Sequence, residues 1–154
     1  MFFEHTQKAF LEARRVLRPR GRVAFLVWGP FHQPYFDSTI SVLLNHVSKP
    51  VEDPAQLSVF RFAEPGSLSA ALESAGFRNV REETRTVPWI WLGTPEELWQ
   101  YCRQVSAPFR TLIESVPASK VRLVDDAVHA AIGRYYDGKR VNFTATVVLA
   151  DAEK

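Results

Sequence analysis

The sequence contains little glycine, a single cysteine and no long apolar run. Its seven glycines are scattered singly among 154 residues, so neither G-x-G-x-x-G nor a P-loop can be found anywhere. A glycine-rich loop that holds a phosphate or a dinucleotide is therefore excluded from this chain. Cys102 is the only cysteine and cannot form a disulfide within the chain, which is typical of a protein from the reducing cytoplasm.

Charge clusters and metal-binding spacings are also missing. Nineteen Lys and Arg residues against seventeen Asp and Glu leave a formal net charge of +2 without a basic run, so we expect no nucleic-acid partner. No apolar stretch approaches the ~18 residues of a membrane span. The histidines, the cysteine and the acids never occur as C-x-x-C, H-x-x-x-H or H-E-x-x-H, so no metal site is predicted.

The most apolar strand of the sequence directly follows the end of its first helix. Apolar residues recur at helical spacing up to Leu17, which predicts an amphipathic helix over residues 6–17 with Thr6 as its N-cap. Residues 23–28, from Val23 to Trp28, show no alternation of apolar and polar residues. This pattern is typical of a strand covered on both faces, so we predict a sheet with helices on both sides.

Three stretches resemble one family of enzymes. The sequence EARRVLRPRGR at residues 12–22, followed by the apolar strand, resembles the helix, turn and fifth strand of class I S-adenosylmethionine-dependent methyltransferases. Ala75-Gly76-Phe77 resembles the entry into their sixth strand, and residues 141–150 resemble the seventh. Within the class, the chain is similar to the small-molecule enzymes grouped with the ubiquinone/menaquinone biosynthesis methyltransferases (methyltransferase type 11).

The resemblance implies an α/β fold that corresponds to the C-terminal half of a Rossmann-like methyltransferase sheet. Residues 1–154 would form a single unit with three strands in the family order five, seven, six, with helices on both faces. Residues 141–150 would lie in the middle, and the polar residues 80–89, which include Pro88, would lie at an edge. A helical substrate cap would be inserted at about residues 94–117, where Thr94-Pro95-Glu96-Glu97 predicts a helix start.

The cofactor implied for the complete enzyme is S-adenosylmethionine. The family binds it through a glycine-rich loop after the first strand and an acidic residue after the second, and this sequence has no counterpart of that loop. We therefore assign no cofactor-binding residue to the chain. We predict that the chain alone binds S-adenosylmethionine weakly or not at all.

The loop after the central strand is the first candidate for a substrate wall. Ligands of open α/β sheets bind outside the carboxyl ends of the strands, and the aromatic loop at residues 29–35 leaves such an end. Trp28, Phe31, His32 and Tyr35 are therefore predicted to contact substrate. The alternative is that these aromatics only cover the sheet end, and for His32 an exposed or structural imidazole is favoured over a general base.

Two further residues are candidates from the rest of the chain. Arg61 stands between two phenylalanines and would clamp an anionic group, or it would simply lay its stem on apolar surface. Trp91 would face substrate together with Trp89 and Trp99, although large aromatics at these spacings are more often core residues. His129 follows Asp125 by one helical turn and is predicted to form a surface pair. No catalytic residue is assigned.

The sequence thus favours methyl transfer to a small-molecule acceptor, with this chain carrying the acceptor side of the site. The alternative is a non-catalytic α+β binding or dimerisation module derived from such an enzyme. If no strand lies beside residues 23–28, this apolar edge would pair with a second copy of the chain. We therefore expect the chain alone to be poorly soluble or to form a homodimer through the Val23 to Trp28 edge.

Overall fold

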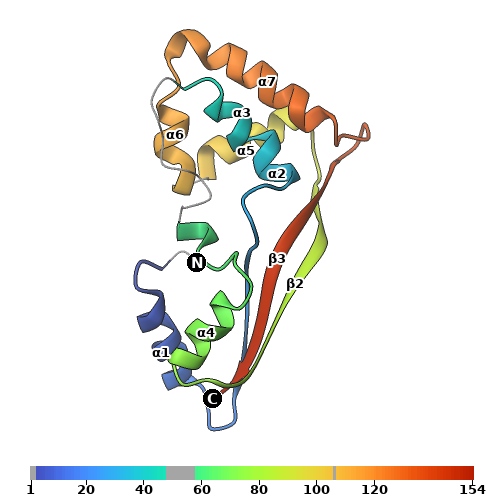
Figure 1. Cartoon of the computed structure of the whole chain (residues 1–154). Helices are drawn as coiled ribbons and strands as arrows, with labels where there is room; N and C mark the ends of the chain where they lie inside the picture. Colours follow the sequence, from blue (N-terminus) through green and yellow to red (C-terminus); the bar gives the residue numbers. More distant parts are fainter. Residues whose placement is uncertain (1–2, 48–57, 106) are drawn as a thin grey trace. The chain divides into compact units, whose positions relative to one another are not determined.

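The computed structural model describes residues 3–47, 58–105 and 107–154, and the fold is mixed α/β. The sequence predicts a connection at residues 50–65, which hold three prolines and no helical period, and part of it lies outside the described residues. The chain divides into two compact units (Figure 1). The sheet unit consists of Met1–Phe31, Ala55–Thr86 and Thr146–Lys154, and the helical unit consists of His32–Pro54 and Val87–Ala145.

The sheet unit contains two helices, one short 3-10 turn and most of a three-stranded sheet. Its elements are α1 (Thr6–Val16), β1 (Arg22–Trp28), η2 (Ser58–Phe60), α4 (Ser67–Ser74), the first part of β2 (Arg78–Trp91) and the last part of β3 (Val141–Glu153). The remaining parts of β2 and β3 belong to the helical unit. The two long strands therefore run through both units.

The strand order is β1-β3-β2, so the last strand of the chain lies in the middle. β1 pairs with β3 in antiparallel register, from Arg22 opposite Glu153 to Trp28 opposite Val147. This order confirms the prediction that residues 141–150 lie between the two earlier strands. It also confirms that the polar strand β2 lies at an edge, where its backbone needs no second partner.

The core of the sheet unit lies on one face of the sheet. Helices α1 and α4 both lie on that side (Figure 1), and their Phe10 and Leu72 are buried in one cluster with Val27 of β1 and Val148 of β3. The prediction of helices on both faces is wrong for this unit as far as the structure describes it. The side chain of Leu26 alternates away from the cluster and is 58% exposed, because no described helix covers that face.

The sequence predicts that Ser67 caps the start of α4 and that Gly76 ends the helix in the left-handed conformation. Gly76 follows it with a φ of +85°, the left-handed conformation that favours glycine. The Phe77 N–H then donates to the Leu72 carbonyl at 3.1 Å, and Phe77 is buried in the core cluster. The start of α4 is capped from β2, since the two carboxylate oxygens of Glu82 accept hydrogen bonds from the amides of Gly66 and Ser69 at 2.6 and 2.7 Å.

The predicted N-cap of α1 is wrong. His5 occupies the N-cap position, and no side chain caps the helix. The Thr6 hydroxyl instead donates to the Phe3 carbonyl at 3.2 Å and accepts a hydrogen bond from the Arg61 guanidinium at 2.6 Å. Thr6 is therefore the first helical residue, with its side chain used for a contact that the sequence does not show.

The helical unit is built from short helices around two longer ones. Its helical elements are α2 (Pro34–Ser38), α3 (Ile40–Leu44), α5 (Pro95–Val105), η3 (Ala107–Phe109), α6 (Arg110–Glu114), η4 (Ala118–Lys120) and α7 (Val121–Gly133). The single helix suggested by the apolar spacing after residue 35 is broken at Thr39, whose hydroxyl donates to the Tyr35 carbonyl at 2.7 Å. The buried residues Phe36, Ile40 and Leu43 nevertheless follow the expected spacing.

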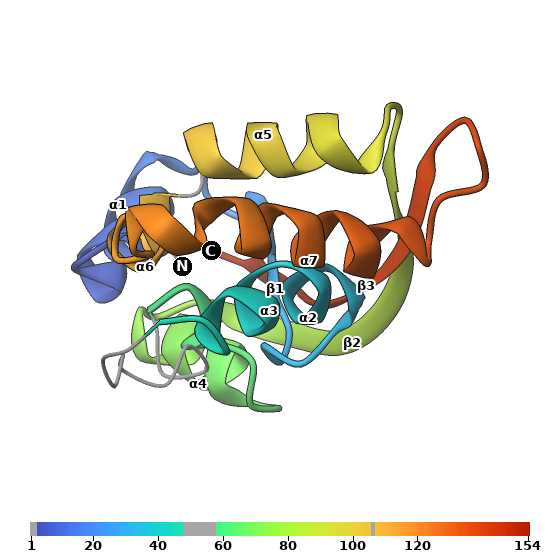
Figure 2. The same cartoon turned by 90° about the horizontal axis from the view of Figure 1, so that it is seen from above.

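The two longer helices of this unit, α5 and α7, run side by side in opposite directions (Figure 2). The predicted capping box starts α5, because the Thr94 amide donates to the Glu97 carboxylate at 2.8 Å and the Glu97 amide donates to the Thr94 hydroxyl at 3.3 Å. Trp99 from α5 and Val128 from α7 are both buried. A polar cleft lies between these two helices.

Candidate functional site

Tyr35 is the predicted site residue with the richest aromatic surroundings. It is the second residue of α2, which Pro34 starts at the first helical position. Its ring centroid lies 4.8 Å from that of Trp89 on β2 and 6.2 Å from that of Phe143 on β3. Trp89 and Phe143 are themselves 5.6 Å apart. Tyr35, Trp89 and Phe143 therefore form one aromatic cluster inside the helical unit, which we call the Tyr35 cluster.

A thiol and a hydroxyl meet at this cluster. The Tyr35 hydroxyl lies 3.1 Å from the Cys102 sulfur, and Cys102 is buried on α5. Burial raises the pKa of the Cys102 thiol, an effect that the hydrogen bond with Tyr35 only partly opposes. The thiolate is the nucleophilic form of cysteine. Cys102 is therefore a weak nucleophile here, and its contact with Tyr35 holds the phenol in place.

Trp91 is two residues further along β2 from Trp89 and packs elsewhere. Its indole lies 5.1 Å from the Tyr101 ring, centroid to centroid. The Trp91 Nε1–H is buried and has no hydrogen-bond partner among the described residues. Trp91 therefore carries one buried donor from which a ligand atom could accept a hydrogen bond. Its contact with substrate stays a prediction.

His32 is placed at the surface of the helical unit. Its side chain is 78% exposed, and its Nδ1 lies 3.1 Å from the Asp37 carboxylate. The pair spans one turn at the start of α2. This arrangement agrees with the alternative of an exposed, structurally bonded imidazole, and no substrate atom is needed to account for it.

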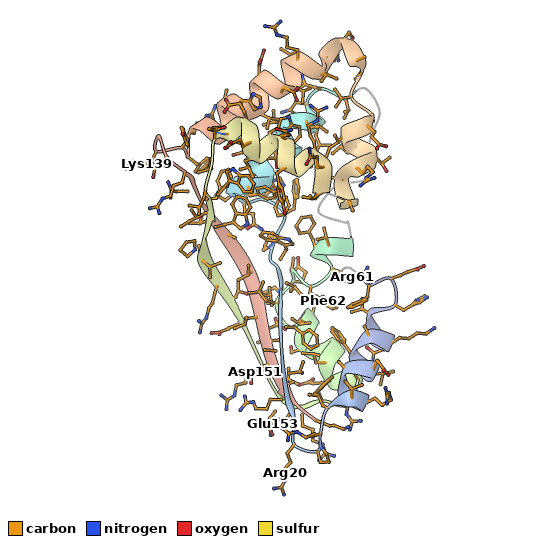
Figure 3. The ribbon with its side chains drawn as sticks, turned by 180° about the vertical axis from the view of Figure 1, so that it is seen from behind. Arg20, Arg61, Phe62, Lys139, Asp151 and Glu153 are labelled. Carbon is orange, nitrogen blue, oxygen red and sulfur yellow. The ribbon has the colours of Figure 1, made fainter. Side chains whose placement is uncertain are left out.

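The other three predicted residues belong to the sheet unit. Phe31 is buried, with its ring centroid 5.5 Å from that of Phe60. Arg61 extends toward the start of α1 (Figure 3), where its guanidinium donates to the Thr6 hydroxyl at 2.6 Å. Trp28 ends β1 opposite Val147. Because Trp28 and Phe31 belong to one unit and His32 and Tyr35 to the other, the prediction that these four residues form a substrate wall stays a prediction.

The sequence did not reveal a polar cleft between α5 and α7. This cleft has a volume of about 530 Å³ and is lined by Glu96, Trp99, Arg103, Asp125 and His129 with two glutamines. The spacing of Asp125 and His129 on α7 was visible in the sequence and suggested only a surface pair. The missing signal was the position of α5, whose polar residues share the cleft with them.

A hydrogen bond between Trp99 of α5 and Asp125 of α7 joins the two walls of this cleft. The buried Trp99 indole donates from Nε1 to the Asp125 carboxylate at 2.6 Å, and Arg103 lies 3.3 Å from the same carboxylate. Hydrogen bonds from its own backbone amide and from Thr94 lower the pKa of Glu96, with a smaller contribution from the charge of His129. The Glu96 carboxylate is therefore ionised at neutral pH, and the Asp125 carboxylate is paired with Arg103.

Neither a metal site nor a membrane-spanning helix is present among the described residues. The described residues contain no group of three histidine, cysteine or acidic side chains placed to hold a metal ion. None of the described helices combines the length and the apolar character that crossing a bilayer requires. The chemistry of the described residues is thus that of aromatic surfaces, one polar cleft and hydrogen-bonding side chains.

Comparisons with known proteins give only distant structural likeness. No protein-family model matches the chain, and no curated protein sequence matches it. Among solved structures, the chain is similar to the provisionally assigned methyltransferase BH2331 of Bacillus halodurans, with 18% identity, a TM-score of 0.44 and coverage of 99% of this chain and 59% of that one. It is also similar to the YcgJ protein of Bacillus subtilis, with 15% identity, a TM-score of 0.41 and coverage of 99% and 58%. The chain spans less than two thirds of the length of either protein.

Proposed function

We propose that this chain provides the acceptor side of an S-adenosylmethionine-dependent methyltransferase that acts on a small molecule. The observation that carries the proposal is the strand order β1-β3-β2. The sequence resemblance predicts that the last strand inserts between the two earlier ones, and this is one of the few orders that a sheet of three strands can adopt. A ubiquinone-type acceptor and a cytoplasmic location belong to the same proposal.

The Tyr35 cluster is the part of the chain that we assign to the acceptor. Methyl transfer from a sulfonium takes its leaving group from the cofactor, so the protein contributes mainly positioning of the acceptor. The partly exposed Trp89 offers a flat apolar surface for an aromatic or quinone-like ring, and the buried Phe143 packs against Trp89 and supports it. The hydroxyl of Tyr35, held by Cys102 at 3.1 Å, would orient a polar substituent of that ring.

The residues of this chain do not fit the cofactor itself. The three glycines with positive φ, Gly66, Gly76 and Gly138, stand alone in turns, and none forms part of a glycine-rich loop. We therefore derive no catalytic step at the cofactor from this chain. In the proposed complete enzyme, a different polypeptide segment supplies the cofactor site.

Calorimetry and complementation test whether the cofactor site lies on a segment outside this chain. We expect the purified chain to give no heat of binding with S-adenosylmethionine, whereas co-expression with a fragment carrying the first four strands of a family member should yield a complex that binds it. The fragment expressed alone is the control. A micromolar dissociation constant for the isolated chain, or a folded complex without cofactor binding, would contradict the proposal.

Substitutions in the Tyr35 cluster test the assignment of the acceptor. In the complemented complex, transfer of labelled methyl groups to small molecules of a cell extract would be measured. Trp89→Ala should raise the KM for the acceptor and leave cofactor binding unchanged, because the Trp89 ring packs on Tyr35 and Phe143 of the cluster. Leu92→Ala, a neighbour that is 83% exposed, is the matched control. Equal KM values of the two variants for the acceptor would contradict the assignment of the Tyr35 cluster to acceptor binding.

A non-catalytic binding or dimerisation module remains the second candidate. One observation favours it, since β1 has a strand neighbour on one side only among the described residues. The complementation experiment separates the two candidates. Failure of the four-strand fragment to join the chain, together with a stable assembly of the chain with itself, would favour the module.

A further inference from the structure

The polar cleft between α5 and α7, which we call the α5–α7 cleft, lies within the helical unit, and none of its lining residues belongs to the Tyr35 cluster. Its volume of about 530 Å³ is within the ~300 to 1,000 Å³ range of small-molecule sites. The two helices run in opposite directions (Figure 2), so the start of α5 lies beside the end of α7. Glu96 and His129 therefore share one end of the cleft, and Arg103 and Asp125 share the other.

The end of the cleft at Asp125 is already balanced. The Trp99 indole donates to the Asp125 carboxylate at 2.6 Å, and the Arg103 guanidinium forms an ion pair with the same carboxylate at 3.3 Å. Asp125 therefore needs no group from a ligand. Because these contacts hold α5 against α7, the walls of the cleft are in place before a ligand binds, which lowers the entropic cost of binding.

The opposite end of the cleft holds a carboxylate and an imidazole that lack matching partners. Glu96 is ionised, and it forms no ion pair with a lysine or an arginine of the described residues. His129 is half-buried, and its ring makes no hydrogen bond within the described part of the chain. Two carboxylates and one guanidinium line the cleft, so one negative charge is left there for a cationic ligand.

A third acceptor lies one turn further along α5. Gln100 follows Glu96 by four residues, so both side chains leave the same face of the helix. The amide of a glutamine carries an acceptor oxygen, a neutral imidazole carries an acceptor nitrogen, and a carboxylate accepts on both oxygens. A primary ammonium carries three N–H donors on one nitrogen. Its donors thus match the three acceptor groups at this end of the cleft.

The rest of the cleft suits an aliphatic chain. Arg103 and Gln104 continue the wall formed by α5, and the methylene stems of such long polar side chains offer apolar surface. The wall from Glu96 to Gln104 extends over eight residues of helix, which is a rise of ~12 Å. A short alkyl chain whose ammonium is bound at Glu96 therefore has room to lie along this wall.

We propose that the α5–α7 cleft binds a small aliphatic primary amine. The ammonium donates to Glu96, Gln100 and His129, and the alkyl chain lies along the stems of the α5 side chains. An anionic ligand is disfavoured, because it would meet the Glu96 carboxylate and would have to replace Asp125 at Arg103. The inference is independent of the proposed function, since the acceptor site assigned to the Tyr35 cluster uses none of these residues.

NMR titration of the full chain with n-pentylamine tests the proposal. At about pH 7.5 a histidine is ordinarily neutral and an alkylamine is ordinarily protonated. We expect saturable binding with a Kd on the order of 1 mM, with the largest amide shifts at Glu96, Gln100 and His129. Trimethylpentylammonium lacks the N–H donors and n-pentanol lacks the charge, so each should bind at least tenfold more weakly. Absence of saturation, or equal affinity for either analogue, would overturn the proposal.

Two variants test whether the amine binds at the Glu96 end of the cleft. Glu96→Gln keeps the shape of the side chain and removes its charge, so it should weaken pentylamine binding by about tenfold or more. His129→Phe keeps a ring and removes the acceptor nitrogen, so it should weaken binding by about fivefold. Glu114→Gln, which changes an exposed glutamate of α6, is the matched control and should leave the affinity unchanged.

Circular dichroism shows whether each variant is folded. Glu96 stands in the first turn of α5, so His129→Phe on the other helix decides the test if Glu96→Gln fails to fold. Unchanged affinity of a folded Glu96→Gln or His129→Phe variant would overturn the proposal. A loss of affinity in Glu114→Gln as large as that in Glu96→Gln would do the same, because it would show that the amine responds only to the net charge of the chain.

Discussion

Removing the carboxylate of Asp125 is the sharpest test of how the helical unit is held together. The Trp99 indole is 3% exposed and donates to Asp125 Oδ1 at 2.6 Å. Asp125→Ala would leave this buried N–H without its acceptor. Trp99→Phe removes the donor and keeps most of the buried ring, so the two variants break the same bond from opposite sides.

The magnitude follows from the burial of the two partners. A buried donor that loses its acceptor costs about 1 to 3 kcal/mol. The Arg103–Asp125 ion pair adds about 0.2 to 1 kcal/mol at most, since both side chains remain partly exposed to solvent. We therefore expect Asp125→Ala to lower the free energy of unfolding by about 2 kcal/mol, which corresponds to a fall in Tm of about 4 to 8 °C for a chain of this size.

A double-mutant cycle isolates the bond itself. Urea unfolding of the two single variants and the double variant would be followed by far-ultraviolet circular dichroism. Because Asp125 and Trp99 share one hydrogen bond, their effects should fall short of additivity by about 1 kcal/mol. Asp125→Asn keeps an oxygen acceptor and should cost about half as much as the alanine variant.

The exposed neighbour Asp126 provides the control on the same helix turn. Asp126→Ala should change the free energy of unfolding by no more than about 0.5 kcal/mol. Equal effects of Asp125→Ala and Asp126→Ala, or strict additivity of the Asp125 and Trp99 variants, would refute the role given to this bond.

Three further predictions concern single residues. Because burial raises the pKa of the Cys102 thiol, a chromogenic thiol reagent at mildly alkaline pH should react only after urea unfolds the chain, and fast reaction of the folded chain would contradict its burial. Hydrogen bonds from the Asn142 side chain and two backbone amides lower the pKa of Asp137 to about 2 from its ordinary value of 3.8. The Asp137 carboxylate therefore stabilises the folded chain fully above pH 3.8, and this stabilisation is lost as the pH falls to about 2. An NMR titration of the Asp137 carboxyl carbon measures this directly, and a midpoint near 4 would count against it. Gly76→Ala should destabilise the chain by about 1 kcal/mol because Gly76 has a φ of +85°, while Gly133→Ala, which meets no atom within 4 Å, should be close to neutral in the same thermal melts.

Local signals in the sequence predicted several elements well. The left-handed Gly76 after α4 and the capping box that starts α5 are both present, because each depends only on residues within one turn of the chain. The predicted middle position of β3 is also confirmed. That position came from resemblance, since β-strand pairing between distant segments leaves no periodic mark on the sequence.

The wrong helix-cap predictions have one physical origin, which is that the side chains involved bind partners far away in the sequence. Thr6 was expected to cap α1, yet its hydroxyl is engaged by Arg61, which is 55 residues away. Ser67 was expected to cap α4, yet Glu82 from β2 fills that role. A short polar side chain near a helix start has the right chemistry for capping, but a carboxylate delivered by packing competes with it.

The candidate site was likewise predictable from the sequence only in part. The aromatic character of Tyr35 and Trp89 was visible in the sequence, as was the exposed position favoured for His32. Their meeting with Phe143 and Cys102 was not, because these four cluster residues come from four different elements. The pairing of Trp99 with Asp125 likewise depends on how α5 packs on α7.

The sequence by itself therefore determined the elements, most of their ends and the absence of a glycine-rich cofactor loop, since each of these depends on residue type and short-range spacing. Only the tertiary structure decided which face of the sheet is covered, which strand pairs with β1 and which side chains meet across α5 and α7. Leu26 shows the reason most clearly. An unbroken apolar strand is compatible with burial on two faces, but burial also requires a second layer, and in the described part of this chain α1 and α4 cover the same face.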